Sequence, residues 1–179
     1  MNANEPRMNE RAAELRLAFD RSFSHAPHSG ITVVEKLLAL RVGSNPYLVR
    51  LAEVAGLFAD KKITWLPTHV AELLGLAGLR GTVLPVYDLG MLLGCPGAAT
   101  QRWLLVTAAM PVGLAFDAFD GYLTVRLEAI IPEVRAEARE RHVREVVHTA
   151  DRVRPLVSLT SVLESIKNRA SHHGSDKER

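Results

Sequence analysis

The chain has 179 residues, of which 22 are Lys or Arg and 20 are Asp or Glu, so its formal charge is only +2. This balance lacks the basic stripe of a nucleic-acid-binding protein, the single cysteine (Cys95) cannot form an internal disulfide, and the longest apolar stretches are too short to span a bilayer. Residues 1–6 also lack the apolar core of a signal peptide. We therefore expect a cytoplasmic protein with no nucleic-acid partner and no direct membrane insertion.

The first predicted element is an amphipathic helix over residues 7–24, which are rich in good helix formers. Its apolar side chains recur at helical spacing at Ala12, Leu15, Phe19 and Phe23. Residues 24–30 are small, polar and interrupted by proline, as is typical of a linker. Residues 1–30 are therefore expected to be an appendage whose apolar stripe packs on its own domain or, less favoured, docks on another protein.

The pattern then changes to a period of two, which is typical of strands. Residues 38–42 and 47–51 flank a turn at residues 43–46 and predict a hairpin. Further short strands are predicted at residues 63–66, 82–87, 102–108, 112–116, 122–125, 143–148 and 153–157. Short, closely spaced strands with few helices predict a mainly β protein built as a barrel or sandwich.

One segment of the chain occurs twice. The sequence PVYDL at residues 85–89 returns as PLVSL at residues 155–159, and each copy leads into a short apolar helix-like run. In each copy a strand ends at an oxygen-bearing side chain, Asp88 or Ser158, that can accept from the free N–H groups of a starting helix. The repeat predicts two similar modules.

The two copies also set the predicted helices and the end of the domain. The first helix is expected to stop at Gly94, and the second to begin near Ser161, where Ser161-x-x-Glu164 matches a capping box. The second helix should run to about Arg169. Residues 168–179 offer little to bury and predict a disordered polar tail.

The sequence contains no strong catalytic or metal-binding pattern. It has no Gly-rich phosphate loop, no His-Glu-x-x-His motif, no cysteine pair and no Gly-x-Ser-x-Gly elbow. The weaker candidates are better interpreted as loop histidines, turn-closing carboxylates and an unactivated thiol: His25, His28, His172, His173, Asp117, Asp120 and Cys95. We expect neither an enzyme nor a bound metal or cofactor.

Residues 75–89, GLAGLRGTVLPVYDL, closely resemble the signature of CheW-type coupling domains, the adaptors of bacterial chemosensory arrays. Residues 47–51, 112–117 and 153–163 resemble further ordered segments of that family, so the resemblance covers roughly residues 34–166. It implies a CheW-like domain over residues 31–167, built of two packed, small, five-stranded β-barrel modules with short helices. This fold agrees with the repeat found independently.

The resemblance implies a non-catalytic adaptor that links the regulatory domain of a CheA-type histidine kinase to the cytoplasmic tip of a chemoreceptor. Arg80 occupies the position of the signature arginine, and Gly75 and Gly81 are expected to shape its loop. The remaining residues of the implied partner-binding set are Val54, Leu57, Phe116 and Asp117. An internal brace remains open as the role of Arg80, as does core packing for Val54 and Leu57.

The chain departs from the family pattern at two positions. Gly56 stands where an acidic residue is common, and Gly78 replaces a common asparagine. An alternative is therefore a CheW-like accessory or competitor that binds only one of kinase and receptor. A small-ligand carrier or enzyme that uses the crevice between modules is the least favoured alternative.

Overall fold

The computed structural model describes residues 33–95, 101–133, 141–149 and 152–174, which belong to the compact unit Val34–Arg179 apart from Val33. The predicted N-terminal helix and linker lie outside the described residues, as do the side chains of His172 and His173. Within the described ranges no helix is both long and apolar enough to cross a membrane.

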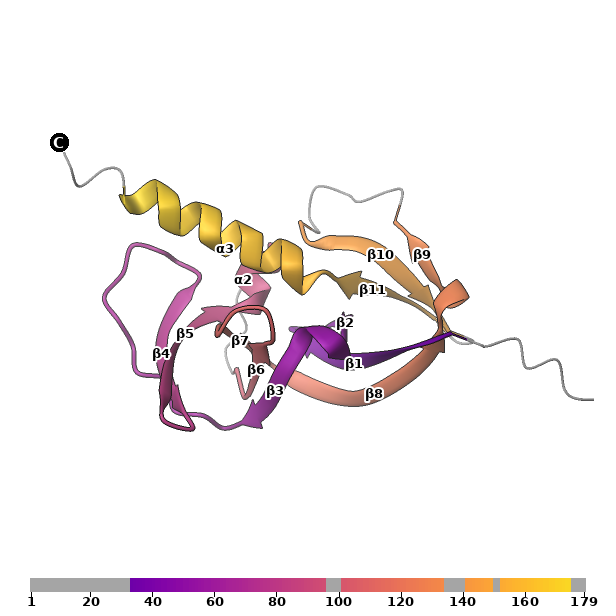
Figure 1. Ribbon diagram of the computed structural model, residues 1–179, viewed down its shortest axis with the longest axis horizontal. Helices are drawn as coiled ribbons and strands as arrows, with labels where there is room; N and C mark the ends of the chain where they lie inside the picture. The colour runs from indigo at the N-terminus through magenta and orange to yellow at the C-terminus, as the bar shows by residue number, and fades with distance from the viewer. Residues whose placement is uncertain (1–32, 96–100, 134–140, 150–151, 175–179) are drawn as a thin grey trace, which may run out of the picture. The chain divides into compact units, whose positions relative to one another are not determined.

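Two β-sheets with a few helices form the domain, which confirms the mainly β prediction (Figure 1). The first sheet has the order β8-β1-β2-β11-β10-β9 and the second β3-β6-β7-β5-β4, so the first has one strand more than the five expected. The strands are β1 Val34–Val42, β2 Asn45–Arg50, β3 Val54–Ala59, β4 Leu73–Leu79, β5 Thr82–Asp88, β6 Trp103–Thr107, β7 Gly113–Phe116, β8 Ala118–Arg126, β9 Ile130–Pro132, β10 Val143–His148 and β11 Val153–Val157. The α-helices are α2 Leu89–Leu93 and α3 Leu159–Gly174, and the 3₁₀ turns are η1 Leu51–Glu53 and η2 Leu127–Ala129.

Each sheet takes strands from both halves of the chain. Strand β5 pairs in parallel with β7, and the repeated strand β11 pairs in parallel with β2. All other strand pairs are antiparallel. The two modules are therefore not consecutive halves of the sequence, because the strand that precedes each α-helix is inserted beside a strand from the other half.

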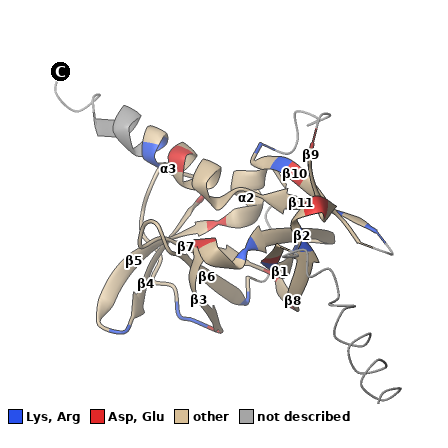
Figure 2. Cartoon of the chain, turned by 45° about the vertical axis from the view of Figure 1, so that its right-hand side comes forward, with Lys and Arg blue, Asp and Glu red and all other residues tan. Residues whose placement is uncertain are grey.

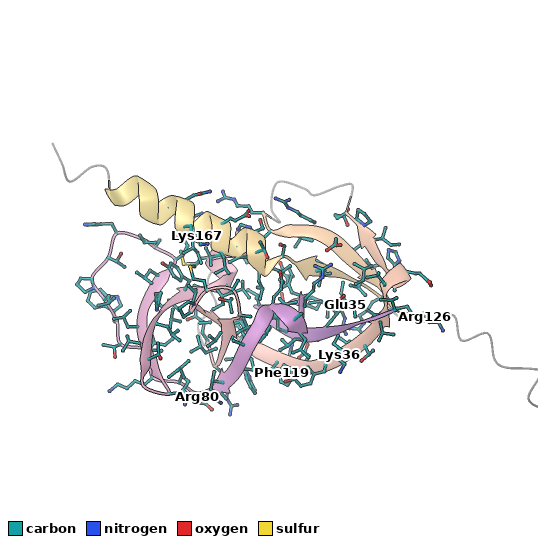
Figure 3. The ribbon with its side chains drawn as sticks, viewed as in Figure 1. Glu35, Lys36, Arg80, Phe119, Arg126 and Lys167 are labelled. Atoms are coloured by element: carbon teal, nitrogen blue, oxygen red, sulfur yellow. The ribbon has the colours of Figure 1, made fainter. Side chains whose placement is uncertain are left out.

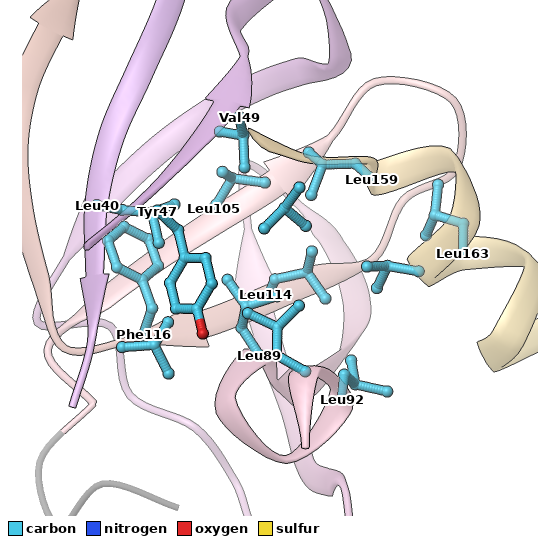
Figure 4. Packing of buried hydrophobic residues seen from close by; sticks show 14 of the residues in the cluster. Leu40, Tyr47, Val49, Leu89, Leu92, Leu105, Leu114, Phe116, Leu159 and Leu163 are labelled. Carbon is cyan, nitrogen blue, oxygen red and sulfur yellow. The ribbon is translucent and has the colours of Figure 1, made fainter. Parts of the chain in front are cut away.

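Three apolar clusters fill the domain. The shared core collects buried side chains from both sheets and both helices, including Leu40, Tyr47, Leu105, Phe116 and Leu163 (Figure 4). The second-sheet core consists of Ala77, Leu79, Leu84, Val86, Leu104 and Ala115. The first-sheet core consists of Leu37, Ala39, Leu48, Val147 and Leu156. Leu37 and Leu38 of β1 lie in different clusters because successive side chains point to opposite faces of a strand.

The sequence did not predict β3, β4 or β9, and the strand it placed at residues 63–66 is wrong. That segment forms only an isolated bridge, Thr64 to Leu76. In β3 and β4 the pairing register shifts between Val54 and Gly56 and between Leu73 and Gly75. A bulge interrupts the alternation of side chains, so the period of two that marks a strand is lost at these positions.

Both helices confirm the repeated strand, cap and helix pattern. The Asp88 carboxylate accepts from the Met91 N–H at 3.1 Å, and Gly94 ends α2 with φ at 81°. At α3 the Ser158 Oγ accepts from the Ser161 N–H at 3.2 Å. The capping box at Ser161 is therefore wrong in register, and α3 runs to Gly174, beyond its predicted end and into the segment assigned to the tail.

Candidate functional site

Arg80 lies at the tip of the hairpin formed by β4 and β5. Leu79 pairs with Thr82, which leaves Arg80 and Gly81 as a two-residue turn with φ of 49° and 82°. Two positive φ angles match a type I′ turn, for which asparagine and glycine are the favoured residues. Holding an arginine in this left-handed region costs about 1 kcal/mol. The turn therefore presents a long cationic side chain at a position where a shorter residue would be more stable.

The Arg80 side chain is exposed and has an aromatic neighbour. Its guanidinium carbon lies 5.9 Å from the centroid of the Phe58 ring, and the Lys61 Nζ lies 5.5 Å from the same centroid. Both distances are within the range of a cation–π contact. Arg80 makes no ion pair or hydrogen bond with another described residue. Among the described residues, the Arg80 side chain has no hydrogen bond to a carbonyl that would support the internal-brace alternative, and its internal contact is the Phe58 ring.

An open groove of about 250 Å³ lies beside Arg80, and we refer to it as the Arg80 groove. Leu79 and Leu84, which are buried in the second-sheet core, contribute to its lining. The other lining residues come from β3, the hairpin, β6 and the following turn: Ala55, Gly56, Phe58, Arg80, Thr82, Val106 and Pro111. Arg80 is the charged member of this set. In Figure 3 it lies at the lower edge of the domain, on the opposite side of the view from Lys167 of α3.

Gly75 does not shape the Arg80 turn, contrary to the expectation. It lies at the bulge of β4 with φ at 146°, and a Cβ atom there would come within 2.1 Å of the Thr64 carbonyl oxygen. Its conformation and its lack of a side chain let the backbone of residues 64–65 approach β4. Of the two glycines, only Gly81 belongs to the turn.

Val54 and Leu57 are partly buried and pack against the shared core. Leu57 and Phe58 are successive residues of β3, and Phe58 packs against the second-sheet core instead. The structure thus brings Phe58, together with Ala55 and Gly56, to the Arg80 groove in place of Val54 and Leu57. Val54 and Leu57 therefore fit the core-packing alternative rather than direct partner contact.

Phe116 and Asp117, the other two predicted partner-binding residues, make contacts within the domain. Phe116 is 1% exposed in the shared core, so its side chain cannot contact a partner directly. The Asp117 carboxylate accepts from the Gly43 N–H and so closes the turn between β1 and β2, whereas the turn expected at Gly121 is absent because β8 continues through Asp120 and Gly121. Asp120, its former candidate partner, forms an ion pair with Arg41 at 3.0 Å.

The sequence did not reveal Phe58 and Lys61 as neighbours of Arg80, because they come close to it only when β3 meets the β4–β5 hairpin.

A row of aromatic rings was likewise not predicted. Trp103 and Phe119 have centroids 5.3 Å apart, and Phe119 and Tyr122 5.1 Å apart, although Trp103 belongs to the other sheet. Tyr122 is 63% exposed at the end of this row.

His142 is buried beside the first turn of α3. Burial lowers the pKa of His142, and the positive charges of Arg141 and Arg144 lower it further. Its Nδ1 lies 3.1 Å from the Ser161 Oγ in the first turn of α3. No group of three or more metal-binding side chains occurs within the described ranges. Figure 2 shows β4 and β5 as largely uncharged strands with basic colour at the tip of their hairpin.

Comparisons with known proteins place this geometry in context. A family model described as a CheW-like domain matches residues 36–167. The probable chemotaxis protein CheW of Rhizobium etli is 30% identical over 142 residues, which cover 76% of this chain and 92% of that protein. The chemotaxis protein CheW of Rhizobium meliloti is 32% identical with the same coverage. The crystal structure of the scaffolding protein TtCheW from Thermoanaerobacter tengcongensis matches with a TM-score of 0.64 and 19% identity, over 70% of this chain and 90% of that chain, and so shares the fold.

Proposed function

Because the chain belongs to the CheW-like family of chemotaxis coupling proteins, we propose that it links the regulatory domain of a CheA-type histidine kinase to the cytoplasmic tip of a chemoreceptor. It would act by binding alone, as a scaffold without catalytic activity. The observation that carries this proposal within the family is Arg80, which is exposed, unpaired among the described residues and fixed on a tight turn beside an open groove.

The chemistry of this site suits contact with another protein. A guanidinium offers five donors in a planar fork that can bind a carboxylate or exposed backbone carbonyls. The turn residues Arg80 and Gly81 hold the base of that side chain, while Phe58 and Gly56 provide an adjoining apolar surface. Val54 and Leu57 support β3 from the shared core, and Gly75 supports β4 through its bulge.

Calorimetric titration of the full chain against the kinase regulatory domain and then the receptor tip tests the proposal. Binding to both is expected, and Arg80→Asn should weaken at least one of the two interactions about tenfold or more, as truncation of an interface arginine commonly does. Asparagine is favoured in a type I′ turn, so this change removes the side chain and keeps the hairpin.

Arg126→Asn is the matched control, since Arg126 is exposed at the end of β8 and lies far from Arg80 in Figure 3. It should leave both affinities unchanged. Unaltered affinity in the Arg80→Asn protein would remove Arg80 from the contact, and failure to bind either partner would contradict the adaptor role.

An accessory that binds only one partner is the second candidate. Gly56 favours it, because the groove has no acidic lining residue at a position where the resemblance leads us to expect one. The same titration separates the two candidates, since saturable binding to kinase alone or receptor alone would identify the accessory.

A further inference from the structure

We infer that the Arg80 groove recognises a partner segment that places a carboxylate beside an apolar side chain. The inference rests on the proposed function, because it takes the groove to be a site of partner contact. It adds the chemical class of the segment that the groove accepts.

The positive charge at the groove is not balanced by a nearby acid. Arg80 and Lys61 both lie within about 6 Å of the Phe58 ring, and neither forms an ion pair with a described residue. Asp60 is the adjacent carboxylate, and it binds the Arg102 guanidinium through Nε at 3.1 Å and 3.3 Å. An acidic side chain from another protein would therefore meet two cations gathered at one ring.

The apolar part of the groove lies next to these cations. Leu79 is 8% exposed and Leu84 is 3% exposed, and Phe58 and Val106 are partly buried beside them. At about 250 Å³ the groove is smaller than the pockets of roughly 300–1,000 Å³ that hold small molecules. It matches the side chains of a docking protein segment better than a separate metabolite.

Gly56 contributes by having no side chain. A Cβ at this position would lie 2.8 Å from Cε2 of the Phe58 ring, so a larger residue would displace the ring. The glycine lets Phe58 lie over β3, where Lys61 and Arg80 approach it. The Phe58 ring thus places the two cations next to the apolar lining of the groove.

The experiment follows amide signals of the isotope-labelled full chain by NMR during titration with acetyl-Leu-Glu-amide and, separately, acetyl-Leu-Gln-amide. The two probes have nearly the same shape and differ in charge. We expect the Glu probe to shift the signals of Phe58, Lys61 and Gly81 at least threefold more than the Gln probe. The difference should shrink at about 0.5 M salt, where exposed charges are screened over a few ångströms.

Lys61→Glu should abolish the preference for the Glu probe, while Lys62→Glu makes the same charge change at the next exposed residue and should retain it. Phe58→Leu should reduce the shifts from both probes. Equal shifts with the two probes, or equal effects of Lys61→Glu and Lys62→Glu, would overturn the inference.

The outcomes also separate this inference from the proposed function. If the Glu preference is present but neither the kinase domain nor the receptor tip binds, the groove chemistry stands and the adaptor role fails. If a partner binds with equal affinity to the Lys61→Glu and Lys62→Glu proteins and the probes are not distinguished, the adaptor role stands and the inference fails.

Discussion

Gly75 and Gly78 lie on the same strand, β4, but differ in backbone conformation and in the space around them. Gly75 has φ at 146° and faces the Thr64 carbonyl, whereas Gly78 has no heavy atom within 4 Å of its hypothetical Cβ and does not adopt a positive φ. The resemblance drew attention to Gly75 as a residue that shapes the Arg80 loop and to Gly78 as a departure from a common asparagine. Their conformations assign Gly75 to the packing of β4 and leave Gly78 tolerant of a side chain.

Gly75→Ala is expected to lower the free energy of unfolding by about 3 kcal/mol or more, through backbone strain and displacement of residues 64–65. Gly78→Ala on the same strand should stay within about 0.5 kcal/mol of the parent. Urea denaturation of both variants measures the difference. Similar values for the two proteins would show that the close approach at Gly75 does not limit stability.

His142 predicts a dependence of stability on pH. Burial, with Arg141 and Arg144, lowers its folded-state pKa below the ordinary 6.5, so the unfolded chain binds a proton more readily. Stability from this group is complete above pH 6.5 and is lost as the pH falls toward and through the lowered value. In urea melts, the free energy of unfolding of His142→Asn should fall less steeply than that of the parent as the pH decreases over this range. His148→Asn, at an exposed position of β10, is the control and should keep the parent slope.

The candidate site was predictable only as far as its contacts are local. Arg80 and Gly81 are adjacent in sequence and form one turn, so the signature located them correctly. Phe58 reaches Arg80 through tertiary packing, and no periodicity could reveal it. Phe116 was assigned to partner contact from its motif, but its 1% exposure depends on both sheets closing over it.

At the scale of elements, α3 begins at a junction assembled from distant residues. Ser158 caps the helix, and the Glu53 carboxylate accepts from the Leu159 N–H at 3.3 Å and the Thr160 Oγ1 at 3.1 Å. The favourable position for a carboxylate at a helix N-terminus is thus filled from η1. The sequence identified Ser158 from the repeat but could not reveal Glu53, which lies more than a hundred residues away.

Ser158→Ala should reduce the free energy of unfolding by about 1 kcal/mol, because the Ser161 N–H loses its acceptor. Glu164→Ala, at an exposed position within α3, should change it by less than about 0.5 kcal/mol. Chemical denaturation followed by circular dichroism can resolve this difference. The reverse order of effects would restore the capping box at Ser161.

Strand prediction succeeded at residues 82–87, 102–108 and 143–148, which became β5, β6 and β10, although the register of β10 also shifts between Val143 and Glu145. Of the strands that it missed, β3 and β4 combine a register shift with an internal glycine. Glycine has low intrinsic strand preference, so β4 is stabilised by its partners β5 and the Thr64 bridge more than by its own composition.

At the scale of the whole domain, the exchange of β1–β2 and β6–β7 between the sheets makes the two halves interdependent. Residues 33–95 contain β1 and β2 of one sheet and β3, β4 and β5 of the other, but β3 pairs only with β6 among the described strands. The shared core likewise needs α2 from the first half and α3 from the second. Neither half contains a complete sheet.

Fragments of residues 33–95 and 101–174 should each lack a cooperative unfolding transition, and an equimolar mixture should regain one. The missing parallel pairs, β5 with β7 and β11 with β2, form only when both fragments are present. Circular dichroism during thermal unfolding tests this expectation. A cooperative transition in either fragment alone would show that a module folds without the strands from the other half.

The same exchange constrains the ancestry of the repeat. A gene that encoded one copy of the strand, cap and helix unit would have produced a chain whose closing strand had no parallel neighbour within its own molecule. Two such chains related by a two-fold axis could have exchanged their first two strands, as β1–β2 and β6–β7 are exchanged here, and completed both sheets. Fusion of the two genes would then have turned a symmetric dimer into a monomer and freed each copy to diverge, and the segment GLRGTVL at residues 78–84, which carries Arg80, precedes the repeat only in the first copy.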